Sequence, residues 1–132
     1  MMDDLRAIAR QIQGDWAKAF ARKDWPALVG LYTDRPAFYG STPELHVTQA
    51  ALRSYFEALP PSLLEAQYAE PEITPIKPGC FAASGDVVFV NRDRDGETGL
   101  AFRMTHVMVR DEGGWRIAVH HASARPGPLL PG

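Results

Sequence analysis

The sequence has a single cysteine, Cys80, so the chain cannot form an internal disulfide bond. It also lacks a basic excess: 14 Lys and Arg stand against 16 Asp and Glu, which argues against a nucleic-acid surface. No apolar run approaches the roughly 18 residues that a membrane span needs. The first residues, Met1-Met2-Asp3-Asp4, lack the apolar stretch of a signal peptide. We therefore expect a cytoplasmic protein with no nucleic-acid or membrane partner.

The residues that are present are typical of a globular domain. Of the 132 residues, 45% are hydrophobic and 23% are charged. A chain of this length forms about one domain and can bury roughly two thirds of the surface that its unfolded form exposes. We expect a single domain over residues 1–124. Three prolines, Pro126, Pro128 and Pro131, predict a Pro-rich C-terminal tail over residues 125–132.

The first half of the sequence is typical of helices. A first helix is predicted from Asp3 or Asp4, either of which can cap it, to about residue 23. Its apolar side consists of Ile8, Ile12, Trp16, Ala19 and Phe20. Asp24 and Pro26 favour the start of a second helix that continues to about Thr33. A short strand over residues 37–39 follows, and then a third helix over residues 49–59.

The second half changes to the period of β-strands. Strands are predicted near residues 65–76, 80–91, 99–110 and 115–123. The acidic Gly-Gly turn over residues 111–114 predicts a tight hairpin with Val109 near Trp115 in antiparallel register. Helices followed by antiparallel strands that are joined by hairpins indicate an α+β fold.

Three segments carry a resemblance to a known family. They are residues 16–28, a helix, a charged corner and a second helix; residues 31–34 with Phe38 and Tyr39; and residues 105–107 with 113–117 and 121–123. In this order they resemble the nuclear transport factor 2-like superfamily, nearest its SnoaL-like, ketosteroid-isomerase-like and kinase-association-domain branch. The resemblance covers about residues 5–124. It implies three N-terminal helices packed on a strongly curved antiparallel β-sheet, a cystatin-like cone with a pocket. Enzymes, binding modules and assembly domains all use this fold.

The functional residues of these relatives are not matched. Ketosteroid isomerases carry a tyrosine and a catalytic aspartate where this chain has Trp16 and Gly40. Polyketide cyclases of the SnoaL-like group use an aspartate late in the sheet, but residues 99–110 and 115–123 contain no acid. His106 and Ala122 fall near two positions where the kinase association domain has pocket arginines. The resemblance therefore implies that no known catalytic set is intact.

The last two strands contain the polar side chains best suited to a site. Alternation puts His106 on one face of its strand and Arg103 on the other, and the sequence leaves open which face lines the pocket. His106 is the candidate catalytic residue, because imidazole exchanges protons near neutral pH. The candidate ligand-binding residues are Trp16, Tyr32, Tyr39, Tyr55, Arg103, His120 and His121. His120 and His121 point to opposite faces, which argues against a metal site.

Three functions remain open at this point. The first is a small-molecule-binding domain in which Arg103 or His106 orients a polar group of the ligand. The second is an isomerase, dehydratase or polyketide-cyclase-type enzyme, with His106 as acid or base and Tyr32 or Tyr39 polarising a carbonyl. The third is an assembly module. We expect no cofactor, a homodimer through the outer sheet face, and a small apolar or carboxylate-bearing ligand.

Overall fold

Three helices and a seven-stranded sheet make up the computed structural model, which describes residues 2–127. The helices are α1 (Met2–Arg22), α2 (Trp25–Val29) and α3 (Gln49–Glu57). The strands are β1 (Tyr32–Tyr39), β2 (Leu45–His46), β3 (Leu63–Tyr68), β4 (Glu72–Lys77), β5 (Cys80–Asp93), β6 (Gly96–Asp111) and β7 (Gly114–Ala124). The predicted α+β class, with N-terminal helices on a curved sheet, is confirmed.

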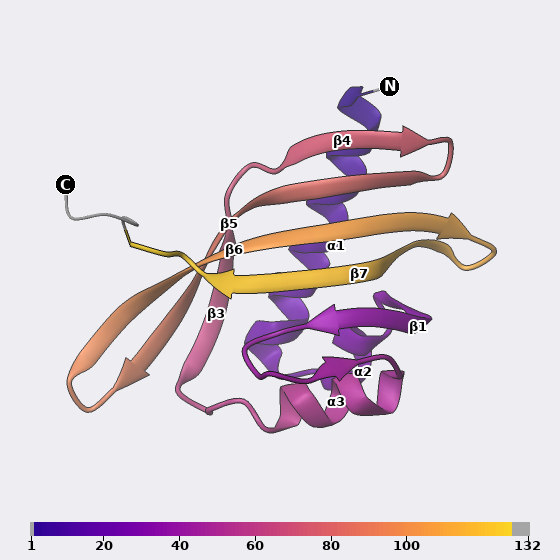
Figure 1. The fold of residues 1–132 in the computed structure, drawn as a ribbon. Coiled ribbons are helices and arrows are strands. Elements are labelled where there is room, and N and C mark those ends of the chain that lie inside the picture. Colours follow the sequence, from indigo (N-terminus) through magenta and orange to yellow (C-terminus); the bar gives the residue numbers. More distant parts are fainter. Residues whose placement is uncertain (1, 128–132) are drawn as a thin grey trace.

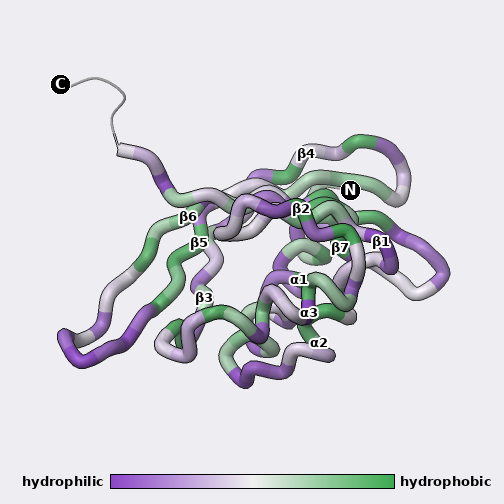
Figure 2. Tube along the Cα trace, turned by 60° about the horizontal axis from the view of Figure 1, so that its bottom comes forward, coloured by the Kyte–Doolittle hydropathy of each residue, from purple (hydrophilic) through white to green (hydrophobic). Residues whose placement is uncertain are grey.

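Local signals in the sequence explain where the helices begin. Asp24 caps α2, since its carboxylate accepts a hydrogen bond from the Ala27 amide at 3.2 Å. Thr48 caps α3 in the same way, through the Ala51 amide at 3.1 Å. Both caps satisfy an N–H group that the first helical turn leaves without a partner. All three helices lie on the same side of the sheet, where α1 crosses the strands (Figures 1 and 2).

The sheet has the strand order β2-β1-β7-β6-β5-β3, and β4 also pairs with β5. The long strands β5 and β6 form a hairpin whose register runs from Cys80 opposite Val109 to Asp93 opposite Gly96. Its tip extends beyond the helices and is polar, as Figure 2 shows. Every strand pair is antiparallel except β1 with β7, which is parallel. This one pair departs from the antiparallel sheet that was expected, because hydrophobic periodicity reports faces and not partners.

Two predicted element boundaries were wrong. The second helix ends at Val29 rather than near Thr33, because the next residues join the sheet instead. The Ile117 amide donates to the Leu31 carbonyl at 2.8 Å, and Tyr32 lies opposite Ile117. The single strand predicted near residues 65–76 is two strands, β3 and β4, which pair with different halves of β5. Pro71 lies in the break between them.

The predicted turn over residues 111–114 joins β6 and β7. Asp111 pairs with Gly114, and Trp115 lies opposite Arg110, one residue from the Val109 position that was expected. Gly114 has φ +101°. The end of β7 at Ala124 coincides with the predicted domain boundary, and residues 128–132 of the predicted tail lie outside the described residues.

The core lies between the helices and the concave face of the sheet. Its largest fully buried side chains include Trp16, Phe20, Tyr32, Phe38, Phe56, Phe81, Met108 and Ile117. Aromatic rings dominate this list. They leave a cavity at one end of the core.

Candidate ligand-binding site

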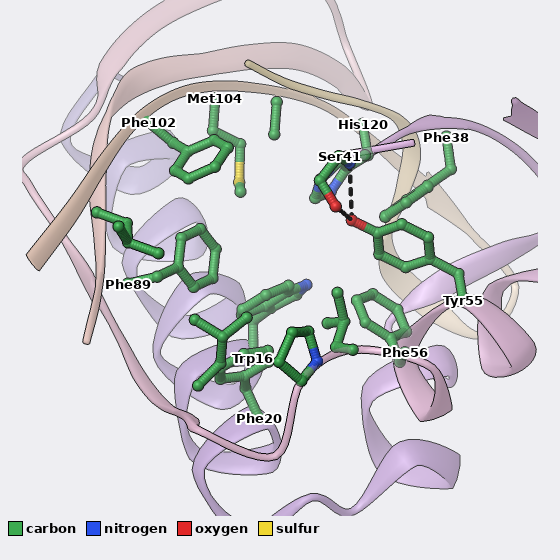
Figure 3. A pocket seen from close by; sticks show the side chains of 16 residues that line it. Trp16, Phe20, Phe38, Ser41, Tyr55, Phe56, Phe89, Phe102, Met104 and His120 are labelled. Atoms are coloured by element: carbon green, nitrogen blue, oxygen red, sulfur yellow. Dashed lines mark hydrogen bonds between the residues drawn. The ribbon is translucent and has the colours of Figure 1, made fainter. Parts of the chain in front are cut away.

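A cavity of about 230 Å³ lies between α1, α3, the loop after β1 and the inner faces of β5, β6 and β7. Seven aromatic residues line it: Trp16, Phe20, Phe38, Tyr55, Phe56, Phe89 and Phe102. Figure 3 shows these side chains converging on the space, with Met104 and His120 in the wall contributed by the sheet. Such a surface can bury an apolar molecule, while polar contacts are restricted to a few points.

One polar point is at the rim of the cavity, where Tyr55 meets the loop after β1. The Ser41 amide donates to the Tyr55 hydroxyl at 2.8 Å, and the two hydroxyl groups also lie 2.8 Å apart (Figure 3). The phenol packs so closely over Gly40 that a Cβ atom there would overlap the Tyr55 hydroxyl. Gly40 is the position at which the resemblance set a catalytic aspartate, and the space for that side chain is taken by Tyr55.

The other polar point is His120, which lies at the centre of a buried hydrogen-bonded chain. Its Nδ1 is 2.9 Å from the Tyr32 hydroxyl and 2.9 Å from His106 Nε2. The Trp16 indole N–H donates to the Tyr32 hydroxyl at 2.9 Å, and Gln13 Nε2 lies 3.3 Å from His106 Nδ1. These five side chains come from α1, β1, β6 and β7. This hydrogen-bonded chain therefore connects α1, at the start of the sequence, with β7, near its end, behind the cavity wall.

Burial keeps the histidines of this chain neutral. It lowers the pKa of His106 to about 3, and it lowers the pKa of His120 well below its ordinary value, with a further contribution from the neighbouring His106. Burial also raises the pKa of Tyr32 far above its ordinary value. At neutral pH the chain is a set of uncharged donors and acceptors. It can orient a polar group, but it offers no charge to an anion.

The structure brings together only some of the side chains that were expected to form the site. Trp16, Tyr55 and His120 line the cavity. Tyr32 and His106 lie behind His120 and are fully buried. His106 therefore does not reach the cavity surface itself.

The remaining candidates lie on the opposite, outer face of the sheet. Arg103 and His121 line a shallow depression there with Val119, and the Tyr39 ring is 5.6 Å from that of His121. Arg103 and His106 therefore lie on opposite faces of the sheet, and the face of His106 is the one that lines the cavity. Their positions differ by an odd number on a strand that is regular between them, so their side chains point to opposite faces.

Sequence reasoning missed several residues of the site. Phe102 and Met104 share a face with His106 by strand alternation, so that pattern could have identified them. Gln13 had a different signal. It is a polar residue within the apolar stripe of α1, next to Ile12 and one turn before Trp16, and only 6% of its surface is exposed. A buried amide needs hydrogen-bond partners, and His106 supplies one.

No group of three or more His, Cys, Asp or Glu side chains among residues 2–127 is arranged to hold a metal ion. None of the helices in the same range is both long and apolar enough to cross a membrane.

Helices packed into a strongly curved sheet are the arrangement of the nuclear transport factor 2-like superfamily with its cystatin-like fold, and both the family model and the solved structures place the chain there. Within that superfamily, the chain belongs to the SnoaL-like domain family, whose model matches residues 9–126. No curated protein sequence matches the chain significantly.

Solved structures with the same fold have varied descriptions. An NTF2-like protein with a cystatin-like fold from Novosphingobium aromaticivorans aligns with a TM-score of 0.82 and 13% identity, over 97% of this chain and 90% of its own. A ketosteroid isomerase-like protein from Erwinia carotovora atroseptica gives 0.76 and 18%, over 95% and 96%. The CaMKII hub of S. rosetta gives 0.75 and 18%, over 89% and 94%. At these identities the similarity establishes the fold alone.

Proposed function

We propose that this protein binds a small, neutral, mostly apolar molecule in the cavity and does not transform it. The observation that carries the proposal is the cavity itself, about 230 Å³ of space with seven aromatic side chains and one imidazole in its wall. An apolar cavity of about 150 Å³ is enough to hold benzene. The space here therefore suits a substituted single ring or a small bicyclic molecule.

A neutral ligand is favoured over the carboxylate that was also considered. Among the described residues that line the cavity, none is Lys, Arg, Asp or Glu. The imidazole of His120 is neutral, because burial lowers its pKa. A carboxylate that entered this space would lose its hydration without gaining a countercharge, which is costly.

Binding is favoured over catalysis because the lining has no group suited to accept a proton. His106, the expected acid or base, is fully buried, and both of its ring nitrogens lie within hydrogen-bonding distance of other side chains. An isomerase, dehydratase or cyclase activity is the second candidate. The observation that favours it is the contact of a neutral imidazole, His120, with the cavity, where its N–H could polarise a carbonyl.

The test is a calorimetric titration with 1-indanone, indane and benzoate, on wild type and on two matched variants. Ala122→Phe fills the cavity, whereas Ser123→Phe places the same ring on the outer face, one residue further along β7. We expect the two neutral probes to bind wild type and Ser123→Phe, and to fail with Ala122→Phe. Benzoate should bind none of them. Equal binding to both variants, or no binding of neutral probes to wild type, would overturn the proposal.

We also propose that two copies associate through the outer face of the sheet. Val119 and Tyr39 are exposed there, and Val119 lies opposite the partly buried Val107. An apolar surface of this kind on a sheet is commonly covered by a partner. The similarity to a structure described as a hub is consistent with self-association.

Light scattering at tens of micromolar concentration tests this association. Val119→Glu should give a monomer, whereas the control Thr98→Glu, near the tip of the β5–β6 hairpin, should leave a dimer. A wild-type protein that is monomeric under these conditions would refute the dimer and leave the cavity proposal unaffected.

A further inference from the structure

The Nδ1 atom of His120 has two hydrogen-bonding neighbours. The Tyr32 hydroxyl and His106 Nε2 each lie 2.9 Å from it. An unprotonated ring nitrogen accepts hydrogen bonds, and a protonated one donates. The state of Nδ1 therefore decides where a neutral His120 carries its proton, and each of the two neighbours constrains that state.

Trp16 fixes the direction of the hydrogen bonds at one end of the chain. An indole N–H can only donate, so the Tyr32 oxygen accepts the bond of 2.9 Å from Trp16 Nε1. The hydroxyl then has its own hydrogen to place, and His120 Nδ1 is the other neighbour at hydrogen-bonding distance. If Tyr32 donates to this nitrogen, His120 Nδ1 is unprotonated and the proton of the neutral ring is on Nε2.

Gln13 fixes the direction of the hydrogen bonds at the other end of the chain. Its amide Nε2 donates toward His106 Nδ1 at 3.3 Å, so His106 Nδ1 is an acceptor. The neutral His106 ring then carries its proton on Nε2, which donates to His120 Nδ1. Both ends of the chain therefore assign the same tautomer to His120, with the proton on Nε2, and the single lone pair of Nδ1 is shared between the Tyr32 O–H and the His106 N–H.

The Nε2 atom of His120 opens on the cavity. In residues 2–127, the only buried side-chain nitrogen or oxygen that lacks a hydrogen-bond partner is His46 Nε2. His120 Nε2 makes no hydrogen bond to the protein and yet is not one of these buried atoms, so part of its surface is accessible. Because His120 is 2% exposed and lines the cavity, the space in front of Nε2 is the cavity.

We propose that the ligand of this site makes its polar contact through an acceptor atom, such as a carbonyl or ether oxygen, which receives the His120 Nε2–H. We further propose that Tyr32 and Gln13 are positioning residues that enforce this preference without lining the cavity. A ligand whose polar group is only a donor would meet the N–H with its own hydrogen and would bind less tightly. The proposal rests on the binding function proposed above.

Histidine ¹⁵N chemical shifts test the tautomer directly, and they do so without a ligand. In the free wild-type protein we expect His120 to have a protonated Nε2 and an unprotonated Nδ1. A protonated Nδ1 would overturn the inference. If no neutral probe bound the protein, the binding function would fail while this reading of the tautomer could still hold, so the two failures are distinguishable.

The ligand preference is tested with 1-indanone, which offers only an acceptor, and indole, which offers only a donor N–H. One neutral hydrogen bond predicts that wild type binds 1-indanone about threefold to tenfold more tightly. Equal affinities, or a preference for indole, would overturn the inference.

The role of the remote residues is tested with Tyr32→Phe, Gln13→Met and the double variant. Each single variant keeps one fixed end of the chain, so the ratio of the two affinities should stay as in wild type. In the double variant, neither end of the chain determines whether His106 or His120 donates the hydrogen bond between them. Its ratio should fall toward one, and both tautomers of His120 should appear in the ¹⁵N spectrum.

A purely structural role would behave differently, because it would weaken both ligands alike and preserve the ratio. Retention of the wild-type ratio and tautomer in the double variant would therefore overturn the positioning role, as would loss of the preference in either single variant. If the double variant did not fold, the wild-type tautomer and the two single variants would still decide.

Discussion

At the scale of single residues, Gly40 is the position where the cavity rim tolerates no side chain. A Cβ atom there would overlap the Tyr55 hydroxyl and crowd the Phe38 ring. We expect Gly40→Ala to displace Tyr55 and break its contacts with Ser41, and to lower the free energy of unfolding by about 1–3 kcal/mol. Urea denaturation measures the change.

Gly127→Ala is the matched control, since nothing lies within 4 Å of a Cβ atom at that position. It should leave the unfolding midpoint where it is. If Gly40→Ala were as stable as this control, the rim loop would be free to move away from Tyr55. The close packing at Gly40 would then make no contribution to the free energy of unfolding.

The residues of the site show what alternation can and cannot predict. Trp16, Tyr55 and His120 were expected in the site from residue type and position, and all three line the cavity. Arg103, Tyr39 and His121 were expected there too, but they lie on the outer face. Alternation separates the two faces of a strand, yet only packing against the helices decides which face is inside. The chain from Gln13 to His120 joins four elements, and no local pattern encodes such a contact.

At the scale of elements, the β6–β7 hairpin depends on one left-handed glycine. Gly114 has φ +101°, whereas Gly113, its neighbour in the turn, is not in that region. We expect Gly114→Ala to lower the free energy of unfolding by about 1–2 kcal/mol, because a Cβ atom strains this backbone conformation. Gly113→Ala should cost less, since its Cβ meets only the movable end of the Arg116 side chain. Thermal unfolding of both variants gives the comparison, and an equal effect would contradict this account of the turn.

Helix α1 contains a glycine whose replacement by alanine should stabilise the protein. Gly14 lies in the middle of the helix, and a Cβ atom there would meet nothing within 4 Å. Alanine is favoured over glycine in a helix interior by about 0.5–1 kcal/mol. Gly14→Ala should therefore raise the melting temperature. A decrease would mean that the groove between α1 and the β3–β4 connection, which Gly14 lines, requires a residue without a side chain at this position.

The sequence was most informative about elements with a local cause. Helix α1 follows from apolar spacing, although it starts at Met2 and so contains Asp3 and Asp4, the predicted caps, in its first turn. Helix α3 follows from apolar spacing and its Thr48 cap, and the β6–β7 turn follows from Gly113 and Gly114. The errors fall where a distant partner decides. Residues 31–33 carry helical spacing, but Tyr32 pairs with Ile117 of β7 and begins strand β1, and the Leu31 carbonyl accepts from the Ile117 amide. Strands β3 and β4 are likewise separate because they pair with different parts of β5.

At the scale of the whole molecule, the buried histidines couple stability to pH. Burial lowers the pKa of His106 from its ordinary value of 6.5 to about 3, so between these values the unfolded chain binds a proton that the folded chain refuses. Stability is therefore complete above pH 6.5 and falls as the pH drops below it. From pH 6.5 to 4.5 we expect a loss of about 2 kcal/mol from His106. The lowered pKa of His120 adds a loss of the same sign. Urea denaturation at a series of pH values measures the slope.

His121 supplies the control for this prediction, because it is an exposed histidine on the same strand as His120. His106→Gln should flatten the slope in this window, and His121→Gln should leave it unchanged. The carboxylates Glu44 and Glu70, whose pKa values are lowered by hydrogen bonds, lose their contribution at a lower pH. A wild-type stability that did not vary between pH 6.5 and 4.5 would show that the histidines are not held neutral.

The parallel pairing of β1 with β7 also has a consequence for how the chain reaches this state. Tyr32 pairs with Ile117 and Phe38 with His120. Strand β1, which is synthesised early, can therefore complete its pairing only after β7, the last strand, has been synthesised. During synthesis on the ribosome, α1, α2, β1 and α3 emerge long before β7 does. Pairing over such a separation in sequence is slow to form, because a long loop must close first. The hydrogen bond between Tyr32 and His120 can then form only in the finished chain. A nascent or truncated product would expose its aromatic residues to chaperones and proteases.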